Sequence, residues 1–535
     1  MKNRIVKTFA VMLMLLALMA GMVIPASAEP PYESYFYDVD GVWVGSANAY
    51  SVSEYITSAT LGVKITALSD MVAYDGMLFV LDKGSMDQPA KVVVLNSNYQ
   101  LVKVIDTFIG VDGQPEQLSQ PEGIEIYKYL GSSNEGKYDL TICDTNNGRI
   151  VRMDLNGQFT HVYTRPDLSI LNTADKEVIY APTKVCFDNT NRLYVVARNI
   201  NQGLICLDPD GSLNSFFGAP EVTADMITRI WRKVLSLAGA AALTSYTPTE
   251  YSNVVSDAKG FVYGTIATPD LESFQAAILT KPGDPLRSTA ANVVRLNAAG
   301  EDILKRMGYV TNCGDLLLDK VEINSGGVTG ATATMSTGFV DVALGTNGVY
   351  SCLDRTRGRI FTYDEDGNLL YVFGNGGNNE CSQVGTTRNT VAIAYMSNDL
   401  AVIDGTYSSI TVYSPTDYGK KVLEAAHLYY DGEYEASEKV WAEVLVRNSN
   451  MYYAYIGTGK ALYRSGEYAE AMKCFREVEN RENYSKALEL YMKEAFGNSF
   501  GIIVVALIVL FVATKIYNGV KKFRAFMQNG VKKVM

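Results

Sequence analysis

Two sets of oxygen-bearing side chains recur along the middle of the chain and could bind a divalent cation. The first set stands at the start of short apolar runs: Asp70, Glu122, Asn253, Asp341 and Asn389. The second set ends the apolar run that follows: Asp82, Asp144, Asp354 and Asp404. If the two runs pair as antiparallel strands, both sets lie at one edge and form an acidic mouth. Carboxylate and amide oxygens are the ligands that Ca²⁺ prefers. The candidate metal ligands are therefore Asp70, Glu122, Asp341 and Asn389, with Ca²⁺ as the candidate cofactor.

The second set also has a structural interpretation. Asp144 precedes Arg149 by five residues, and Asp354 precedes Arg359 by the same spacing across one hairpin turn. A carboxylate placed there can accept hydrogen bonds from turn N–H groups and pair with the Arg. We expect this role for the second set and keep the metal role for the first.

Other catalytic chemistry has little support in the sequence. The two His residues, His161 and His427, stand near no nucleophile motif, and no phosphate-binding or dinucleotide-binding fingerprint is present. The seven Cys residues are scattered without metal-ligand spacing, and several lie inside apolar runs. Small buried thiols are favoured over a disulfide framework. We therefore expect no catalytic residues.

The elements that would position these side chains form a repeat. Between about residues 60 and 415, a short apolar strand, a second strand, a third strand and a D-x-x-G turn recur six times. One copy runs through 122–126, 140–144 and 149–154 with Gly157, and another through 340–343, 349–354 and 359–364 with Gly367. Each copy is a small antiparallel sheet that cannot bury both faces alone, so the copies must stack radially. The prediction is a mainly β, six-bladed β-propeller.

These repeats resemble the NHL-repeat and gluconolactonase-like six-bladed β-propellers over about 360 residues. The lactonase branch of that resemblance implies one Glu, two amide side chains and one Asp around a divalent ion. Glu122 and Asn389 could take part, but Lys184 and Val340 stand where other ligands are expected. The lactonase set is therefore incomplete, and a metal-dependent lactonase or esterase is the alternative function. A helical insertion at about 222–243 is expected to pack on the propeller rim.

A different period follows the propeller. Gly432-Glu433-Tyr434 recurs as Gly466-Glu467-Tyr468 at a spacing of 34. This resembles two tetratricopeptide (TPR) repeats within 418–495, with Gly459 and Ala471 where close helix contact needs small residues. Two repeats are fewer than independent stability usually requires, so they should lean on the propeller or on a partner. The partner-binding candidates are Tyr429, Tyr430, Tyr452 and Tyr455, joined by Tyr453 and Tyr463. The alternative is that these rings pack inside the molecule.

The ends of the chain predict where the protein resides. Residues 1–28 combine a basic start, an apolar run and an A-x-A site, as in a secretory signal peptide. Residues 496–517 are long and apolar enough for a transmembrane helix, and the basic tail 518–535 predicts a cytoplasmic C-terminus. The propeller, 29–417, would then face outward from a bacterial cell membrane.

Composition narrows the range of partners. Hydrophobic residues make up 47% and charged residues 20%, which excludes a disordered chain. The net charge is −11 although both ends are basic, so the body is strongly acidic and nucleic acid is not expected as a partner. The prediction is a membrane-anchored extracellular scaffold. Its propeller would bind a ligand, a glycan or a membrane or secreted protein, its helical repeats would bind a membrane-proximal partner, and its last helix would bind the lipid bilayer.

Overall fold

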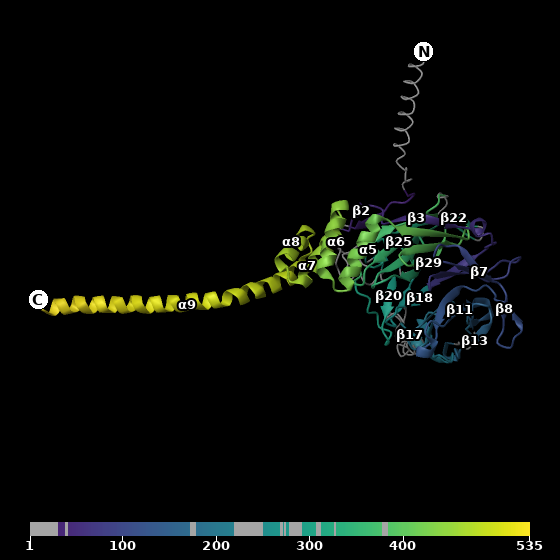
Figure 1. The fold of residues 1–535 in the computed structure, drawn as a ribbon, viewed down its shortest axis with the longest axis horizontal. Helices are drawn as coiled ribbons and strands as arrows, with labels where there is room; N and C mark the ends of the chain where they lie inside the picture. Colours follow the sequence, from purple (N-terminus) through teal and green to yellow (C-terminus); the bar gives the residue numbers. More distant parts are fainter. Residues whose placement is uncertain are drawn as a thin grey trace, which may run out of the picture.

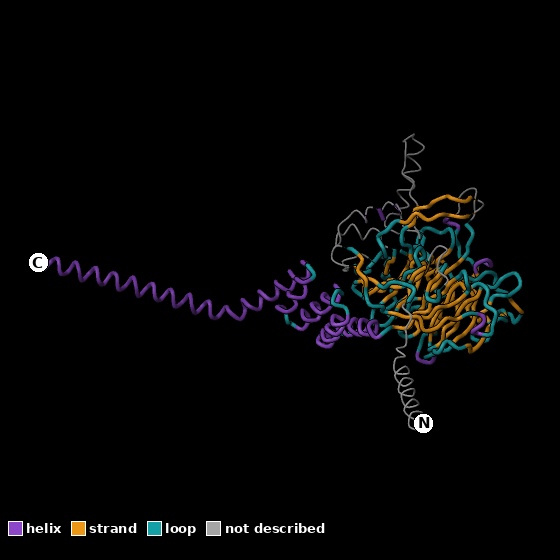
Figure 2. Tube along the Cα trace, turned by 90° about the horizontal axis from the view of Figure 1, so that it is seen from above, coloured by secondary structure: helices purple, strands orange, loops and turns teal. Residues whose placement is uncertain are grey.

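The structure is a computed structural model in which strands form one body and helices lie at one end of it (Figures 1 and 2). It describes residues 30–37, 41–171, 178–218, 250–267, 271, 274–275, 277, 292–306, 312–325, 328–376 and 383–534. The predicted signal peptide and the helical insertion at about 222–243 lie outside these residues.

Six antiparallel sheets form the blades. Blade 1 holds β4 (Leu68–Tyr74), β5 (Met77–Asp82), β6 (Lys91–Leu95) and β7 (Leu101–Ile105). Blade 2 holds β10 (Gly123–Lys128), β11 (Tyr138–Asp144), β12 (Arg149–Met153) and β13 (Phe159–Tyr163). Blade 3 holds β14 (Pro182–Phe187), β15 (Leu193–Ala197), β16 (Leu204–Leu207) and β17 (Leu213–Phe217). Blade 4 holds β18 (Asn253–Ser256), β19 (Val262–Thr265) and β20 (Val293–Leu296).

The last two blades contain strands from both ends of the propeller sequence. Blade 5 holds β23 (Phe339–Leu344), β24 (Tyr350–Asp354), β25 (Ile360–Tyr363) and β26 (Leu369–Phe373), extended by β1 (Tyr35–Tyr37) and β2 (Trp43–Gly45). Blade 6 holds β29 (Thr390–Met396), β30 (Asp399–Asp404) and β31 (Ser409–Pro415), with β3 (Tyr50–Ile56) as its outer strand. Smaller elements are α2 (Ser58–Leu61), the pair β8 (Phe108–Ile109) and β9 (Pro115–Glu116), the hairpin β21 (Asp319–Ser325) and β22 (Val328–Met335), and the pair β27 (Asn375–Gly376) and β28 (Thr386–Thr387).

The six blades close into a ring. The innermost strands β4, β10, β14, β18, β23 and β29 each contact the next one, and β29 contacts β4 again. β3 seals the ring by pairing with β31, with Tyr50 opposite Pro415 and Ile56 opposite Ile410. Apolar side chains of neighbouring blades pack between the sheets, as Phe79 and Leu140 do between blades 1 and 2. The predicted six-bladed β-propeller is thereby confirmed.

The helices stack beside blades 5 and 6. α5 (Asp417–Tyr430), α6 (Tyr434–Arg447), α7 (Tyr452–Ser465) and α8 (Tyr468–Glu477) each pack on the next, and α8 packs on α9 (Arg481–Val534). Thr416 caps α5, its hydroxyl accepting from the backbone N–H of Gly419. A Cβ on Gly459 would lie 2.6 Å from the Phe475 ring, so this close approach requires glycine, as predicted. Trp441 joins side chains of blades 5 and 6 in one continuous core.

α9 leaves the helical stack and extends away from the propeller as a single long rod (Figure 1). Its segment Val504–Met527 is long and apolar enough to cross a membrane, with a mean hydropathy of 1.7, and none of it is buried. This segment overlaps the predicted span 496–517 and begins a few residues later. Among the described residues it is the one helix that qualifies as a membrane span.

Candidate functional site

A polar layer crosses the central channel of the propeller. Asp70, Lys184, Asn253 and Asp341 come from the inner strands of blades 1, 3, 4 and 5, and all are at least nine-tenths buried. The Nζ of Lys184 lies 2.6 Å from a carboxylate oxygen of Asp70, and the Asn253 amide donates to Asp341. Buried carboxylates are costly unless they are paired in this way.

The two carboxylates of this layer also fasten neighbouring blades. Asp70 accepts a hydrogen bond of 2.9 Å from the backbone N–H of Ile124 in blade 2. Asp341 accepts one of 2.7 Å from the backbone N–H of Ile393 in blade 6. Burial raises the pKa of Asp341 to about 7, opposed by the charge of Lys184. The layer therefore ties blade 1 to blade 2 and blade 5 to blade 6.

A cavity of about 410 Å³ opens above the layer, on the face where the inner strands begin. Its charged lining residues are Lys83, Glu122, Lys184, Arg198, Glu250 and Arg355. The Glu122 carboxylate pairs with the Arg198 guanidinium and lies 3.7 Å from the Nζ of Lys83. With four cations against two carboxylates, the mouth is not the acidic one predicted from the sequence.

The predicted metal ligands do not gather around one point. Asp70 and Asp341 lie in the buried layer on either side of Lys184, Glu122 is engaged by two cations in the cavity, and Asn389 is exposed at the rim. Within the described part of the chain, no group of three His, Cys, Asp or Glu side chains could hold a metal ion. The carboxylates instead neutralise Lys and Arg side chains.

The Asp residues that end the second strands bind backbone. Asp82 accepts from the N–H groups of Thr66, Ala67 and Gly84 at 2.9 to 3.0 Å. Asp144 accepts from the backbone N–H of Ser119. Asp354 accepts from the backbone N–H groups of Gly338, Thr356 and Arg357. Asp404 accepts from those of Arg388, Thr406 and Tyr407. Each carboxylate thus ties the end of its second strand to the segment that enters the blade, which is the structural role expected for this set.

One of the two predicted Asp–Arg pairs is present. Arg149 Nε lies 2.8 Å from the Asp144 carboxylate. The prediction for Asp354 and Arg359 was wrong, because Arg359 pairs with the buried carboxylate of Asp315, a residue between blades 4 and 5. Asp315 also accepts from the Tyr35 hydroxyl at 2.6 Å. Arg359 thereby links the N-terminal strand β1 to blade 5.

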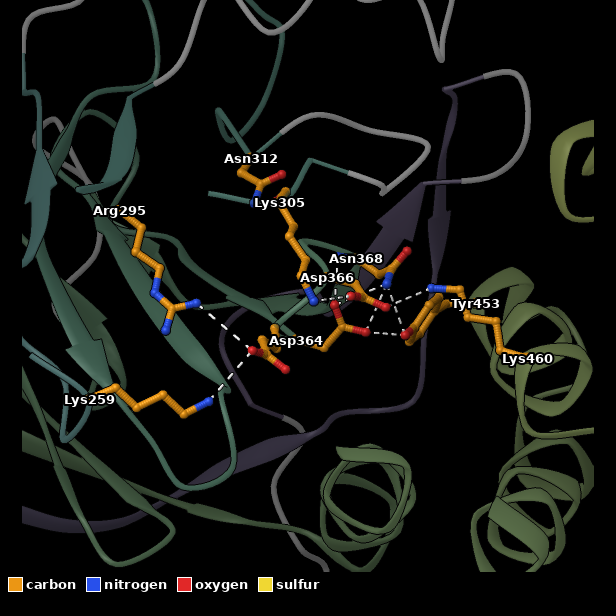
Figure 3. Close-up of polar contacts among 10 residues, drawn as sticks. Lys259, Arg295, Lys305, Asn312, Asp364, Asp366, Asn368, Tyr453 and Lys460 are labelled. Atoms are coloured by element: carbon orange, nitrogen blue, oxygen red, sulfur yellow. Dashed lines mark hydrogen bonds and ion pairs between the residues drawn. The ribbon is translucent and has the colours of Figure 1, made fainter. Parts of the chain in front are cut away.

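A second polar cluster joins the helices to blade 5 (Figure 3). The turn between β25 and β26 presents Asp364 and Asp366 to α7. The Tyr453 hydroxyl donates to Asp364, and the Nζ of Lys460 lies 3.1 Å from an Asp366 oxygen. Lys305 approaches Asp366 from the propeller side, at 3.0 Å. This junction lies on the face of the propeller opposite the mouth, the face where third strands end and where Asn347 of the β23–β24 turn donates to Asp431 at the end of α5.

Three of the predicted partner-binding tyrosines, Tyr429, Tyr430 and Tyr453, line this junction. Tyr452 and Tyr453 are each only 8% exposed, and Tyr455 packs against the shared core. Tyr429 and Tyr430 are half-buried beside cations, with Lys259 Nζ 5.2 Å from the Tyr430 ring. The partner-binding hypothesis required Tyr452 to be exposed, whereas this side chain is buried. The helices pack on the propeller.

Sequence reasoning missed two cations of the mouth, Lys83 and Arg355. Each directly follows an Asp that ends a second strand, so the repeat itself carried the signal. The structure places Ala197 at the end of β15, and Arg198 is the next residue, equivalent to Lys83 and Arg355.

No protein-family model matches the chain, and no curated protein matches it. Among solved structures, it is similar to Raptor of Chaetomium thermophilum, at 10% identity and a TM-score of 0.31 over 72% of this chain and 30% of that one. It is similar to PorZ of Porphyromonas gingivalis, a surface component of a type-IX secretion system, at 10% identity and a TM-score of 0.32. That match covers 64% of this chain and 46% of the PorZ chain. It is also similar to a glucose dehydrogenase, at 8% identity and a TM-score of 0.36. That match covers 69% of this chain and 99% of the dehydrogenase chain.

The chain spans less than half the length of the Raptor and PorZ chains that it matches. At these TM-scores none of the three proteins informs on the role of this chain. The number of blades follows from the strand pairing of the chain itself.

Proposed function

We propose that this protein is a single-pass membrane protein that displays its propeller outside the cell as a binding module. The observation that supports the proposal is the position of the mouth. The charged cavity opens on the propeller face where inner strands begin, whereas the helices contact turns on the opposite face. α9 then extends away from the propeller. With α9 in a bilayer, the mouth is directed outward, toward ligands in solution.

The finer parts of the proposal rest on the sequence. Residues 1–28 act as a signal peptide, the blades are divergent NHL-like units, and the helical hairpins are TPR-like units. The ligand of the propeller is a small molecule, a glycan or a protein. A membrane-proximal partner of the hairpins would contact Tyr455 and Tyr463, which are half-buried, more readily than Tyr452.

Topology is tested by cysteine accessibility in intact cells. Four native thiols in blades 2, 3 and 5 are buried, as is Cys313. Replacing the other two Cys residues, Cys381 and Cys474, by Ser therefore gives a protein with little labelling of its native thiols. Ser132→Cys, in an exposed loop of blade 2, should react with a membrane-impermeant maleimide. Asn529→Cys should react only after permeabilisation. The opposite pattern would refute an outward-facing propeller.

A further inference from the structure

Three cations of the mouth occupy one and the same position of the repeat. Lys83, Arg198 and Arg355 each follow the residue that ends the second strand of a blade. The backbone N–H of each donates to the carbonyl just before the inner strand, at Ala67, Ala181 and Gly338, over 3.0, 3.0 and 2.9 Å. The three side chains therefore start from equivalent points of the fold.

These cations belong to alternate blades. Lys83 lies in blade 1, Arg198 in blade 3 and Arg355 in blade 5. The residues that follow the second strands of blades 2, 4 and 6 are the uncharged Thr145, Ile266 and Gly405. Because the blades follow one another around a closed ring, the cations surround the cavity at three evenly distributed positions.

The cavity below the three cations suits a small ligand. Its volume of about 410 Å³ holds a molecule of one or two sugar-sized or amino-acid-sized units and excludes a folded domain. Lys184 lines its floor and is only 9% exposed, with its ammonium group paired to Asp70. Positive charge focused in a concave site on an acidic protein attracts anions.

Glu122 already occupies part of this positive site. Its carboxylate pairs with Arg198 and lies 3.7 Å from Lys83 Nζ. The pairing shows that these cations can bind a carboxylate group. Arg355, by contrast, has no carboxylate partner among the described residues. An incoming carboxylate would compete with Glu122 for Arg198 and Lys83.

We propose that the mouth binds a small polycarboxylate, with Lys83, Arg198 and Arg355 each contacting a carboxylate group. This inference rests on the proposed function, because it names the class of ligand for the outward-facing cavity. Charge-assisted hydrogen bonds from Arg and Lys supply the affinity, and the three-blade spacing selects anions with several carboxylates over those with one.

The test is calorimetric titration of the purified full-length protein in detergent, in buffer freed of divalent cations by a chelating resin, using citrate as the probe. Acetate serves as the single-carboxylate comparison and the peptide Glu-Glu-Glu as the chain-borne source of carboxylates. Citrate should bind, and acetate should bind at least tenfold more weakly. Tighter binding of the peptide than of citrate would assign the ligand to a peptide rather than to a free metabolite, with the carboxylate chemistry unchanged.

Three variants make the test specific. Arg198→Gln should weaken citrate binding about tenfold, the loss expected for one charge-assisted contact. Glu122→Gln should tighten binding about fivefold, because the competing carboxylate is gone. Arg192→Gln is the matched control: it removes an Arg of the same blade that also pairs with a carboxylate, Asp188, but on the opposite face. It should leave binding unchanged.

The proposal is overturned if citrate does not bind at millimolar concentration, if acetate binds as well as citrate, or if Arg198→Gln and Arg192→Gln behave alike. It is also overturned if Glu122→Gln abolishes binding, because a cation-bridged site would respond in that way. The labelling pattern in cells does not depend on citrate, so failure of the polycarboxylate site and failure of the outward-facing topology are distinguishable.

Discussion

The hydroxyl of Tyr453 is the contact through which the junction between α7 and blade 5 can be measured. Tyr453→Phe removes only this hydroxyl, which donates to the Asp364 carboxylate. Asp364 is 9% exposed, and burial raises its pKa above the usual value of a carboxyl group, opposed by Lys460. The donor is thus lost from a buried, charge-bearing acceptor.

The expected loss in the free energy of unfolding depends on the hydrogen bonds that the Asp364 carboxylate keeps after the substitution. A hydrogen bond to a charged group contributes about 1.5–3 kcal/mol to stability. After the substitution, Asn368 still donates to both Asp364 oxygens, through its backbone N–H at 2.8 Å and its amide at 2.8 and 3.0 Å. We therefore expect a loss of about 2 kcal/mol. With a urea m-value of about 3 kcal/mol/M, the unfolding midpoint falls by about 0.7 M.

Trp441 reports on this region, because its ring lies 5.4 Å from the Tyr453 ring in an edge-to-face arrangement. Replacing Trp43 and Trp231 by Phe leaves Trp441 as the single fluorophore among the three Trp residues. Urea unfolding of the full-length protein in detergent then measures the change. Tyr468→Phe is the control, since the Tyr468 hydroxyl makes no hydrogen bond within the described structure, and it should cost under about 0.5 kcal/mol. Equal, small effects of the two substitutions would refute the argument.

Three further predictions follow from the channel and the blades. Burial raises the pKa of Asp341 to about 7 and that of Asp354 to about 6, so between these values and pH 4 the folded state retains protons that the unfolded state has released. The free energy of unfolding should therefore fall as the pH rises from about 4 to 7, and Asp341→Asn should make it depend less on pH. Urea midpoints that rise across this range would contradict the assignment. Gly123→Ala should cost about 1–3 kcal/mol, because the new Cβ would collide with the Thr183 carbonyl of blade 3, whereas Gly45→Ala has open space and serves as the control in thermal melts. The protein should not hydrolyse lactones with Ca²⁺ or Zn²⁺, because Lys184 stands beside Asp70 and two cations hold Glu122; turnover that disappears in Glu122→Gln would show this to be wrong.

The blades were predictable because each one repeats the same apolar strands and turn residues. Six copies gave the correct architecture even where blade 4 was stretched. The closing strand β3 was not predicted, since Tyr50–Ile56 precedes the first copy and its partner lies at the far end of the propeller sequence. Pairing across such a distance leaves no local pattern in the sequence.

The site was predicted less well because charge pairing depends on tertiary neighbours. The spacing of Asp354 and Arg359 suggested a local ion pair, but Asp315 competes successfully for Arg359 from a segment outside the blade pattern. The sequence indicated an aromatic contact surface on the helices, and Tyr452 and Tyr453 of α7 are buried. It could not tell whether that surface meets a partner or the propeller of the same chain.

The ring closure by β3 has a consequence for the order in which the protein is made. A chain synthesised from its N-terminus exposes β3 early, but the partner strand β31 follows about 360 residues later. Blades 1 to 5 can form as they emerge, while β3 waits as an unpaired edge. Such an edge invites pairing with another chain, and the exposed Glu54 on β3 opposes it with charge. Closure therefore becomes possible only once Ser409–Pro415 has been made, before the helices α5 to α9, and long-range pairing of this kind makes it a slow step of folding.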